Sequence, residues 1–261
     1  MNPRFALASL AVFAFCSKPG FADLTLSGYS VIGSFGMPVS GQEQIMIHKT
    51  SVRRDLIDRG RAYTHLFDLD KHQAVIIDHL FRRAEVYDLN AMQANAEVNA
   101  PVSGLKLEIE RMDGKHTLRN WTCREYNLTA SIPARMGNEE TVFQLKGQIW
   151  LAQGVREQVE VKSLVKMAKS PDFFLAIPDV ARMMPAQAKA MSEVMRKLAP
   201  KGLPCEGEVE FSYEGNGPMA NLARKMPTKL GFTFQNYSTD PIAQDAFAIP
   251  AGYQVMQGRR P

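Results

Sequence analysis

The sequence contains few of the features that identify an enzyme or a metalloprotein. Its 261 residues include 3 cysteines, 5 histidines and 2 tryptophans. It has no Gly-x-Ser-x-Gly nucleophile elbow, no His-Glu-x-x-His or Cys-x-x-Cys pair, and no glycine-rich phosphate loop between a strand and a helix. No signature of a hydrolase, a zinc protease or a nucleotide-binding enzyme is therefore present. We expect a non-enzymatic protein with no catalytic residues, no cofactor and no metal site.

The chain also lacks a strong excess of charge. There are 31 Lys and Arg residues against 27 Asp and Glu, a formal net charge of +4. This balance is too mild to favour nucleic acid or an anionic membrane surface as a partner. Pairs such as Arg53-Arg54 are scattered along the chain, so we interpret them as solvated surface residues. After the N-terminal segment, no apolar run is long enough to predict a transmembrane helix.

The N-terminal segment 1–22 resembles a secretory signal peptide. Arg4 provides a short positive region, Phe5–Cys16 is apolar, and Gly20–Ala22 places small residues at a cleavage site. Loss of this segment removes Arg4 and Lys18, so the net charge becomes +4 − 2 = +2. Phe15 precedes Cys16, where lipoprotein processing requires a small residue. We therefore expect a protein exported by a cleaved signal peptide, with a single domain over 23–261.

Two cysteines, Cys123 and Cys205, remain in the expected mature chain. An even pair in an oxidising compartment predicts a disulfide. The alternative is a metal-binding or redox pair, but neither cysteine has a Cys-x-x-Cys or a nearby histidine partner. A structural disulfide is the favoured interpretation.

Alternating apolar residues are the strongest pattern in the chain. Four segments carry them at every second position: 105–109, 143–151, 209–213 and 230–234. A strand with this period buries one face and exposes the other. Short alternating segments between 24 and 89 predict a further meander. The predicted fold class is α+β: a curved antiparallel sheet with helices covering its concave face.

Turn residues predict where these strands end. The Asp113-Gly114 pair indicates a tight hairpin, residues 36–41 a turn and residues 132–140 a loop. The apolar period becomes helical at about 155–199, where Pro178 and Pro185 can each occupy the first turn of a helix. We expect this segment to form a lid over the sheet. An insertion follows at about 200–226, with one helical turn near 219–226.

The expected lid is rich in methionine. Met184, Met191 and Met195 are near helical spacing. They suit packing in the core, a deformable groove for a lipid or peptide, or soft Cu(I) ligation, and the last is the least favoured. His65, His72 and His79 are seven residues apart, but they fall in a predicted strand and two turns. Surface histidines are therefore favoured over a metal site.

Several short segments resemble the LolA/LolB/RseB superfamily of envelope proteins, and the chain is most similar to a less characterised periplasmic branch of it. The segments are Asp68–Lys71, Ala74–Ile77, Trp121–Tyr126, Gly147–Ala152 and Phe247–Tyr253. The resemblance implies an incomplete β-barrel covered by helices, in the periplasm, with an apolar groove for acyl chains, a lipoprotein or a partner segment. The chain differs from the lipoprotein carriers in its expected disulfide and insertion, and no carrier motif aligns residue by residue.

Two hypotheses follow for the function. In the first, the concave face of the sheet holds a lipid, a lipoprotein or another apolar ligand. In the second, helices fill the concavity and the protein is a structural or accessory subunit of an envelope complex. For the first, the residues expected to bind the ligand are Phe143, Leu145, Ile149, Phe232, Phe234, Met184, Met191 and Met195.

Overall fold

A computed structural model describes residues 23–34, 37–58, 60–91, 104–118, 121–136, 138–153, 185–225 and 228–258. Twelve strands in these residues form one sheet. The strands are β1 (Leu24–Ser34), β2 (Met37–His48), β3 (Ser51–Asp58), β4 (Arg61–Asp68), β5 (Gln73–Asp78), β6 (Arg83–Asp88), β7 (Lys106–Leu118), β8 (Trp121–Met136), β9 (Glu139–Ala152), β10 (Leu203–Glu214), β11 (Thr228–Ser238) and β12 (Gln254–Gln257). The helices are α5 (Pro185–Leu198) and α6 (Pro218–Lys225), with short 3-10 turns η1 (Ala199–Lys201) and η2 (Gln244–Phe247).

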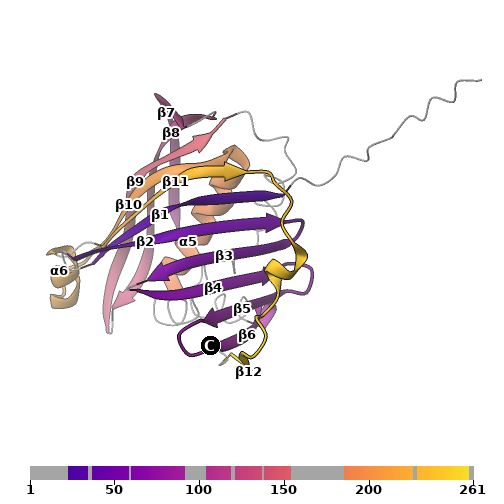
Figure 1. Ribbon diagram of the computed structural model, residues 1–261. Helices are drawn as coiled ribbons and strands as arrows, with labels where there is room; N and C mark the ends of the chain where they lie inside the picture. The colour runs from indigo at the N-terminus through magenta and orange to yellow at the C-terminus, as the bar shows by residue number, and fades with distance from the viewer. Residues whose placement is uncertain are drawn as a thin grey trace, which may run out of the picture.

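The sheet consists of two meanders joined side by side. Its order is β12-β6-β5-β4-β3-β2-β1-β11-β10-β9-β8-β7, so β1 and β11 join the two. Neighbouring strands are antiparallel except β12, which runs parallel to β6. The sheet is open and strongly curved, and β7, β8 and β9 turn behind the front strands (Figure 1). The predicted curved sheet is confirmed, with one parallel pair at its edge.

Irregular pairing helps the sheet to curve. The β1–β11 register shifts beside Ser27 and Gly28, which makes Gln235 the extra residue of a bulge. Gly28 is required there, because a Cβ atom would lie 2.0 Å from the carbonyl oxygen of Thr233. Because of the bulge, Gln235 and Asn236 both line the same pocket as Ser27.

We call the face that carries Leu26, Ile45 and Phe143 the inner face, and the opposite face the outer face. Apolar side chains of both meanders form the inner core, and α5 packs there through Ala190 and Val194. α5 lies inside the curve of the sheet (Figure 1). Its start at Pro185 confirms the predicted first-turn proline. The rest of the expected lid, 155–184, lies outside the described residues.

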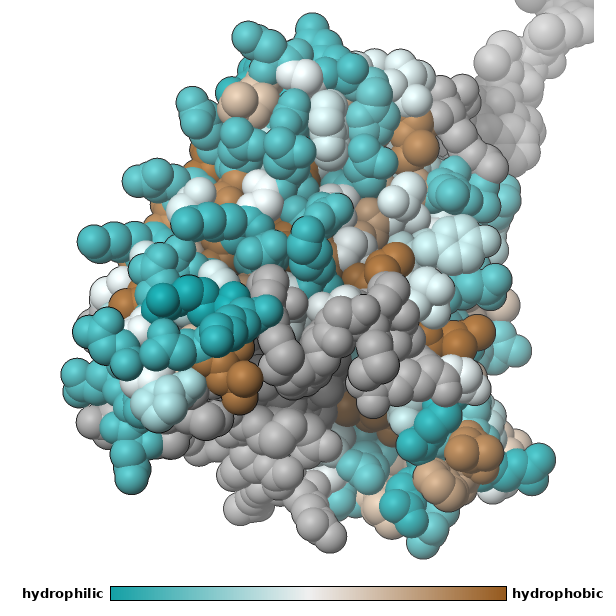
Figure 2. Space-filling model, turned by 90° about the vertical axis from the view of Figure 1, so that its left-hand side faces the viewer, coloured by the Kyte–Doolittle hydropathy of each residue, from teal (hydrophilic) through white to brown (hydrophobic). Residues whose placement is uncertain are grey.

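The C-terminal residues 239–253 lie on the outer face. Ile249 and Tyr253 pack against Leu66, Val75 and Ile77 of β4 and β5. This segment covers an apolar part of the sheet that would otherwise be exposed. On the side that carries α6, hydrophilic residues predominate and hydrophobic residues form small separate patches (Figure 2).

Three turn predictions are wrong. Asp113-Gly114 lies inside β7, where the register with β8 shifts between Arg111 and Lys115, so this pair serves a bulge rather than a hairpin. The expected loop at 132–140 and turn at 36–41 are largely strand, because β8, β9 and β2 extend through them. Cross-strand pairing overrides the local turn preference at these positions.

The expected insertion at 200–226 contains β10, which pairs with β9 and β11 in the middle of the sheet. The part of this span from Leu203 to Glu214 therefore belongs to the sheet itself. The predicted helical turn near 219–226 is confirmed as α6.

Candidate functional site

A cavity of about 130 Å³ lies on the inner face, between α5 and strands of both meanders. Most of its lining is apolar. The residues that line it are Leu26, Ser30, Glu43, Ile45, Arg54, Leu128, Ile149, Leu151, Val194, Met195, Leu198, Ala199, Gly202, Pro204, Val209, Leu230, Phe232 and Phe234. Its walls come from seven strands of the sheet, β1, β2, β3, β8, β9, β10 and β11, and from the end of α5, so only the folded chain assembles them.

Four of the residues predicted to bind ligand line this cavity: Ile149, Phe232, Phe234 and Met195. Two others, Phe143 and Leu145, are fully buried in the adjoining core and do not line it. Met184 and the side chain of Met191 lie outside the described part of the structure. We retain the four lining residues as candidates, while Phe143 and Leu145 support the wall behind them.

An ion pair inside the lining was not expected from the sequence. Arg54 Nε donates to Glu43 Oε1 over 2.7 Å, and the Glu43 side chain is only 7% exposed. Arg54 is two residues after Val52, which packs in the inner core. Because residues two apart on a strand share a face, periodicity could have placed Arg54 on the inner face. Its neighbour Arg53 lies on the outer face and donates to Asp55 and to the carbonyl oxygen of Ala246. The surface interpretation of Arg53-Arg54 is therefore corrected: both side chains hold structural contacts.

His65 is opposite Arg54 in the β3–β4 register. It is buried, which corrects its interpretation as a surface histidine. Burial, together with the positive charge of Arg54, lowers the pKa of His65 from 6.5 to about 3. Its Nδ1 atom has no hydrogen-bond partner among the described residues. The ring is therefore neutral at pH 7 and belongs to the interior.

A disulfide joins Cys123 of β8 to Cys205 of β10, with 6.4 Å between the Cα atoms. Both cysteines are fully buried. They flank Ala152 at the end of β9, since Cys123 is paired with Ala152 and Cys205 lies at the β9–β10 register shift. The bond ties together three strands next to Pro204, which lines the inner cavity.

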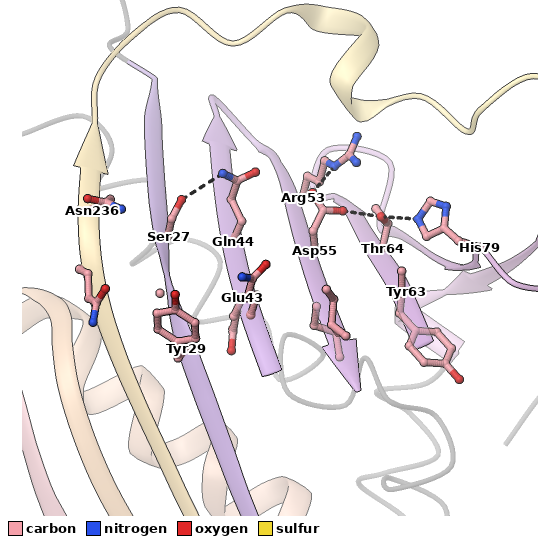
Figure 3. A pocket seen from close by; sticks show the side chains of 16 residues that line it. Ser27, Tyr29, Glu43, Gln44, Arg53, Asp55, Tyr63, Thr64, His79 and Asn236 are labelled. Atoms are coloured by element: carbon pink, nitrogen blue, oxygen red, sulfur yellow. Dashed lines mark hydrogen bonds and ion pairs between the residues drawn. The ribbon is translucent and has the colours of Figure 1, made fainter. Parts of the chain in front are cut away.

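A second hollow, which we call the outer groove, lies on the opposite face of the sheet and measures about 550 Å³. Its floor is mainly polar, as Figure 3 shows. The lining residues are Ser27, Gly28, Tyr29, Gln42, Glu43, Gln44, Arg53, Asp55, Leu56, Ile57, Ala62, Tyr63, Thr64, His79, Gln235 and Asn236. From the sequence, Arg53 and His79 were interpreted as surface residues. No other lining residue was selected as a site residue, because each belongs to a strand that looks ordinary by itself.

Hydrogen bonds connect the floor of the outer groove to the C-terminal segment. Asp55 accepts from the hydroxyl of Thr64, whose oxygen lies 2.8 Å from Nε2 of His79. Nδ1 of His79 lies 2.9 Å from the hydroxyl of Tyr253. His79 is therefore held from both sides, which orients its ring at the end of the groove.

Two other kinds of feature bear on function, namely clusters of metal-ligating side chains and membrane-spanning helices. Within the described residues, no three His, Cys, Asp or Glu side chains are grouped closely enough to hold a metal ion. In that same part of the chain, no helix is long and apolar enough to cross a membrane.

Similarity to known proteins is found among solved structures. No protein-family model matches the chain, and no curated protein is significantly similar to it. Among solved structures, the chain is similar to a domain from Vibrio parahaemolyticus described as an outer membrane lipoprotein-sorting protein domain. The identity is 6%, the match covers 88% of this chain and 91% of that domain, and the TM-score is 0.31. This match assigns no role to any residue of the chain.

Proposed function

We propose that this protein is an exported, non-enzymatic binding protein that holds an acyl chain or another apolar segment of a lipid or lipoprotein in its inner cavity. The observation that carries the proposal is the cavity itself. It is lined mainly by apolar side chains, and Ile149, Phe232, Phe234 and Met195 were expected from the sequence to bind such a ligand.

The size of the cavity suits a short apolar segment. Its volume of about 130 Å³ is close to that of engineered apolar cavities of about 150 Å³, which stay dry and bind benzene. Each methylene group buried there contributes about 0.8 kcal/mol. Glu43 and Arg54 pair with each other, so the remaining lining favours an uncharged segment.

In this proposal, the methionines of the segment 155–199 contact the ligand. α5 is the described part of this segment, and Met195 contributes a flexible thioether to the cavity wall. Met184 and Met191 remain proposed ligand contacts of the same segment. We propose that the flexible thioether of Met195 adapts the cavity wall to apolar chains of different length.

A matched pair of variants tests the proposal. Ser30 lines the inner cavity and Ser27 lines the outer groove, and both are on β1. Ser30→Phe adds a ring to the cavity without deleting a core side chain, and Ser27→Phe adds the same ring on the other face. We expect wild type and Ser27→Phe to bind cis-parinaric acid, measured by its fluorescence, and Ser30→Phe to bind about tenfold more weakly or worse. Equal binding by all three proteins would contradict the proposal.

A specific observation also favours the second hypothesis, a structural or accessory subunit with a filled concavity. Ala190 and Val194 of α5 are fully buried against the sheet, which is the packing of a permanent core. Native mass spectrometry of the protein purified from an envelope fraction separates the two functions. An added mass that extracts as lipid supports a binding protein, whereas a bare mass or a stable protein complex supports the subunit.

A further inference from the structure

The floor of the outer groove is a row of polar side chains that crosses five strands. Asn236 of β11 is paired with Ser27 of β1, and Ser27 with Gln44 of β2. The row continues through Asp55 of β3 to Thr64 of β4. Strands in a sheet are about 4.8 Å apart, so the row is about 19 Å long. It runs across the strands, beside the C-terminal segment that contacts Arg53 and His79 (Figure 3).

The row combines hydrogen-bond donors and acceptors without free charge. Its amides and hydroxyls can each both donate and accept hydrogen bonds. The charged carboxylates and guanidinium of the lining are already paired, Asp55 with Arg53 and Glu43 with Arg54. Gln235 and Asn236 add two consecutive exposed amides because of the bulge in β11. The floor therefore matches a neutral ligand that carries many hydroxyl or amide groups.

Apolar and aromatic surface borders this row. Tyr29 is 46% exposed and Ile57 is 42% exposed. In Figure 3 the ring of Tyr29 lies beside the polar row. A tyrosine ring offers an apolar face together with a polar hydroxyl. Sugar rings have the complementary arrangement, with hydroxyls around the rim and apolar C–H groups on the face.

Other ligand classes fit this groove less well. The paired charges give no attraction for a polyanion. A peptide cannot add to the sheet here, because β1, β2, β3 and β4 each have a hydrogen-bonded neighbour on both sides. An amphipathic helix needs an apolar groove, and this floor is polar.

We infer that the outer groove is a binding site for a neutral oligosaccharide. The amides and hydroxyls of the row accept and donate hydrogen bonds to the sugar hydroxyls, and the ring of Tyr29 packs against a sugar face. The hydrogen bonds that join Thr64, His79 and Tyr253 hold one end of the floor in place before the ligand arrives. This site is separate from the inner cavity and does not depend on the function proposed for it.

Isothermal titration calorimetry with maltohexaose, cellohexaose and chitohexaose tests this inference on the full mature protein. We expect at least one of the three to bind wild type. Tyr29→Ala should weaken that binding about tenfold or more, whereas Tyr29→Phe should retain most of it, because the ring is kept. Tyr29 is exposed, so neither substitution should prevent folding, which circular dichroism checks.

The two serine variants separate the two sites. Ser27→Phe should lose the oligosaccharide and keep cis-parinaric acid, and Ser30→Phe should do the reverse. If none of the three hexasaccharides binds wild type, or if Tyr29→Ala binds as wild type does, the inference is overturned. A failure of cis-parinaric acid to bind would instead count against the inner cavity alone.

Discussion

The buried His65 predicts a specific loss of stability in acid. Its pKa is lowered to about 3 in the folded protein, first by burial and then by Arg54, from a value of 6.5 in the unfolded chain. Between pH 6.5 and pH 3 the unfolded chain therefore binds a proton that the folded protein does not bind. Stability must fall as pH decreases through this window, and it is fully present only above about pH 6.5.

The magnitude follows from the same two pKa values. Each pH unit within the window contributes about 1.4 kcal/mol, so lowering the pH from 7 to 5 should cost about 2 kcal/mol at this one residue. Asp68 also has a shifted pKa: burial opposes the shift, but the ion pair and hydrogen bonds with Lys71 lower the value overall. Its contribution to stability is fully present above about pH 4 and is lost only as the pH falls below that value, where an ordinary Asp binds a proton. Between pH 5 and pH 7, the change in the free energy of unfolding therefore reports the protonation of His65 without a contribution from Asp68.

The perturbation is His65→Leu, with His65→Gln as a second variant that also cannot titrate. Urea unfolding of each protein at pH 7 and pH 5, followed by the fluorescence of Trp121 and Trp150, gives the free energy of unfolding. We expect wild type to lose about 2 kcal/mol more than either variant between the two pH values. The two variants can differ from each other at pH 7, because only one is polar. If wild type and both variants lose the same stability within about 0.5 kcal/mol, the pKa argument is refuted.

Other predictions concern stability and ligand binding. Replacing Cys123 and Cys205 together by serine opens a loop with a sequence separation of 82 residues, and we expect urea unfolding to show a loss of roughly 4.5 kcal/mol on the chain-entropy model. An unchanged free energy of unfolding would contradict the model, in which the disulfide limits the conformations of the unfolded chain. Gly28→Ala should cost about 2 kcal/mol or more, because its Cβ atom would meet the Thr233 carbonyl of β11. Gly33→Ala on the same strand is the control, since no atom lies closer than 3.9 Å, and equal effects of the two changes would contradict the steric argument. Ser30→Phe should weaken the binding of cis-parinaric acid and keep that of the oligosaccharide, and Ser27→Phe should do the reverse.

Part of the candidate site could be predicted from the sequence because strand periodicity is local. Phe232 and Phe234 alternate with Thr233, and the structure places both phenylalanines on the inner cavity. The same rule applied to Val52 and Arg54 would have placed Arg54 inside. Two consecutive basic residues suggest solvent exposure, so the sequence analysis interpreted Arg54 as a surface residue. The ion pair of Arg54 with Glu43 was therefore not predicted.

Local turn signals were less reliable than periodicity. Asp113-Gly114 has the residues of a tight hairpin, yet β7 continues to Leu118. The pairing of β7 with β8 resumes at Lys115 and extends to the end of β7. Several cross-strand hydrogen bonds and the half-buried apolar side chains of β7, such as Leu118, outweigh the preference of two residues for a turn.

The alternation of apolar and polar residues, by itself, determined that this chain forms a curved sheet with one buried face, because the side chains of a strand alternate between its two faces. The apolar spacing likewise predicted a helix within 155–199 with Pro178 and Pro185 as two possible first-turn residues, and α5 has Pro185 as its first described residue. Only the tertiary structure decided which strands are neighbours, and so which side chains meet. Asn236 and Ser27 are far apart in the sequence and adjacent in the outer groove because β11 pairs with β1 across a bulge. Both proposed binding sites depend on that pairing, since each takes its lining from strands of the two meanders.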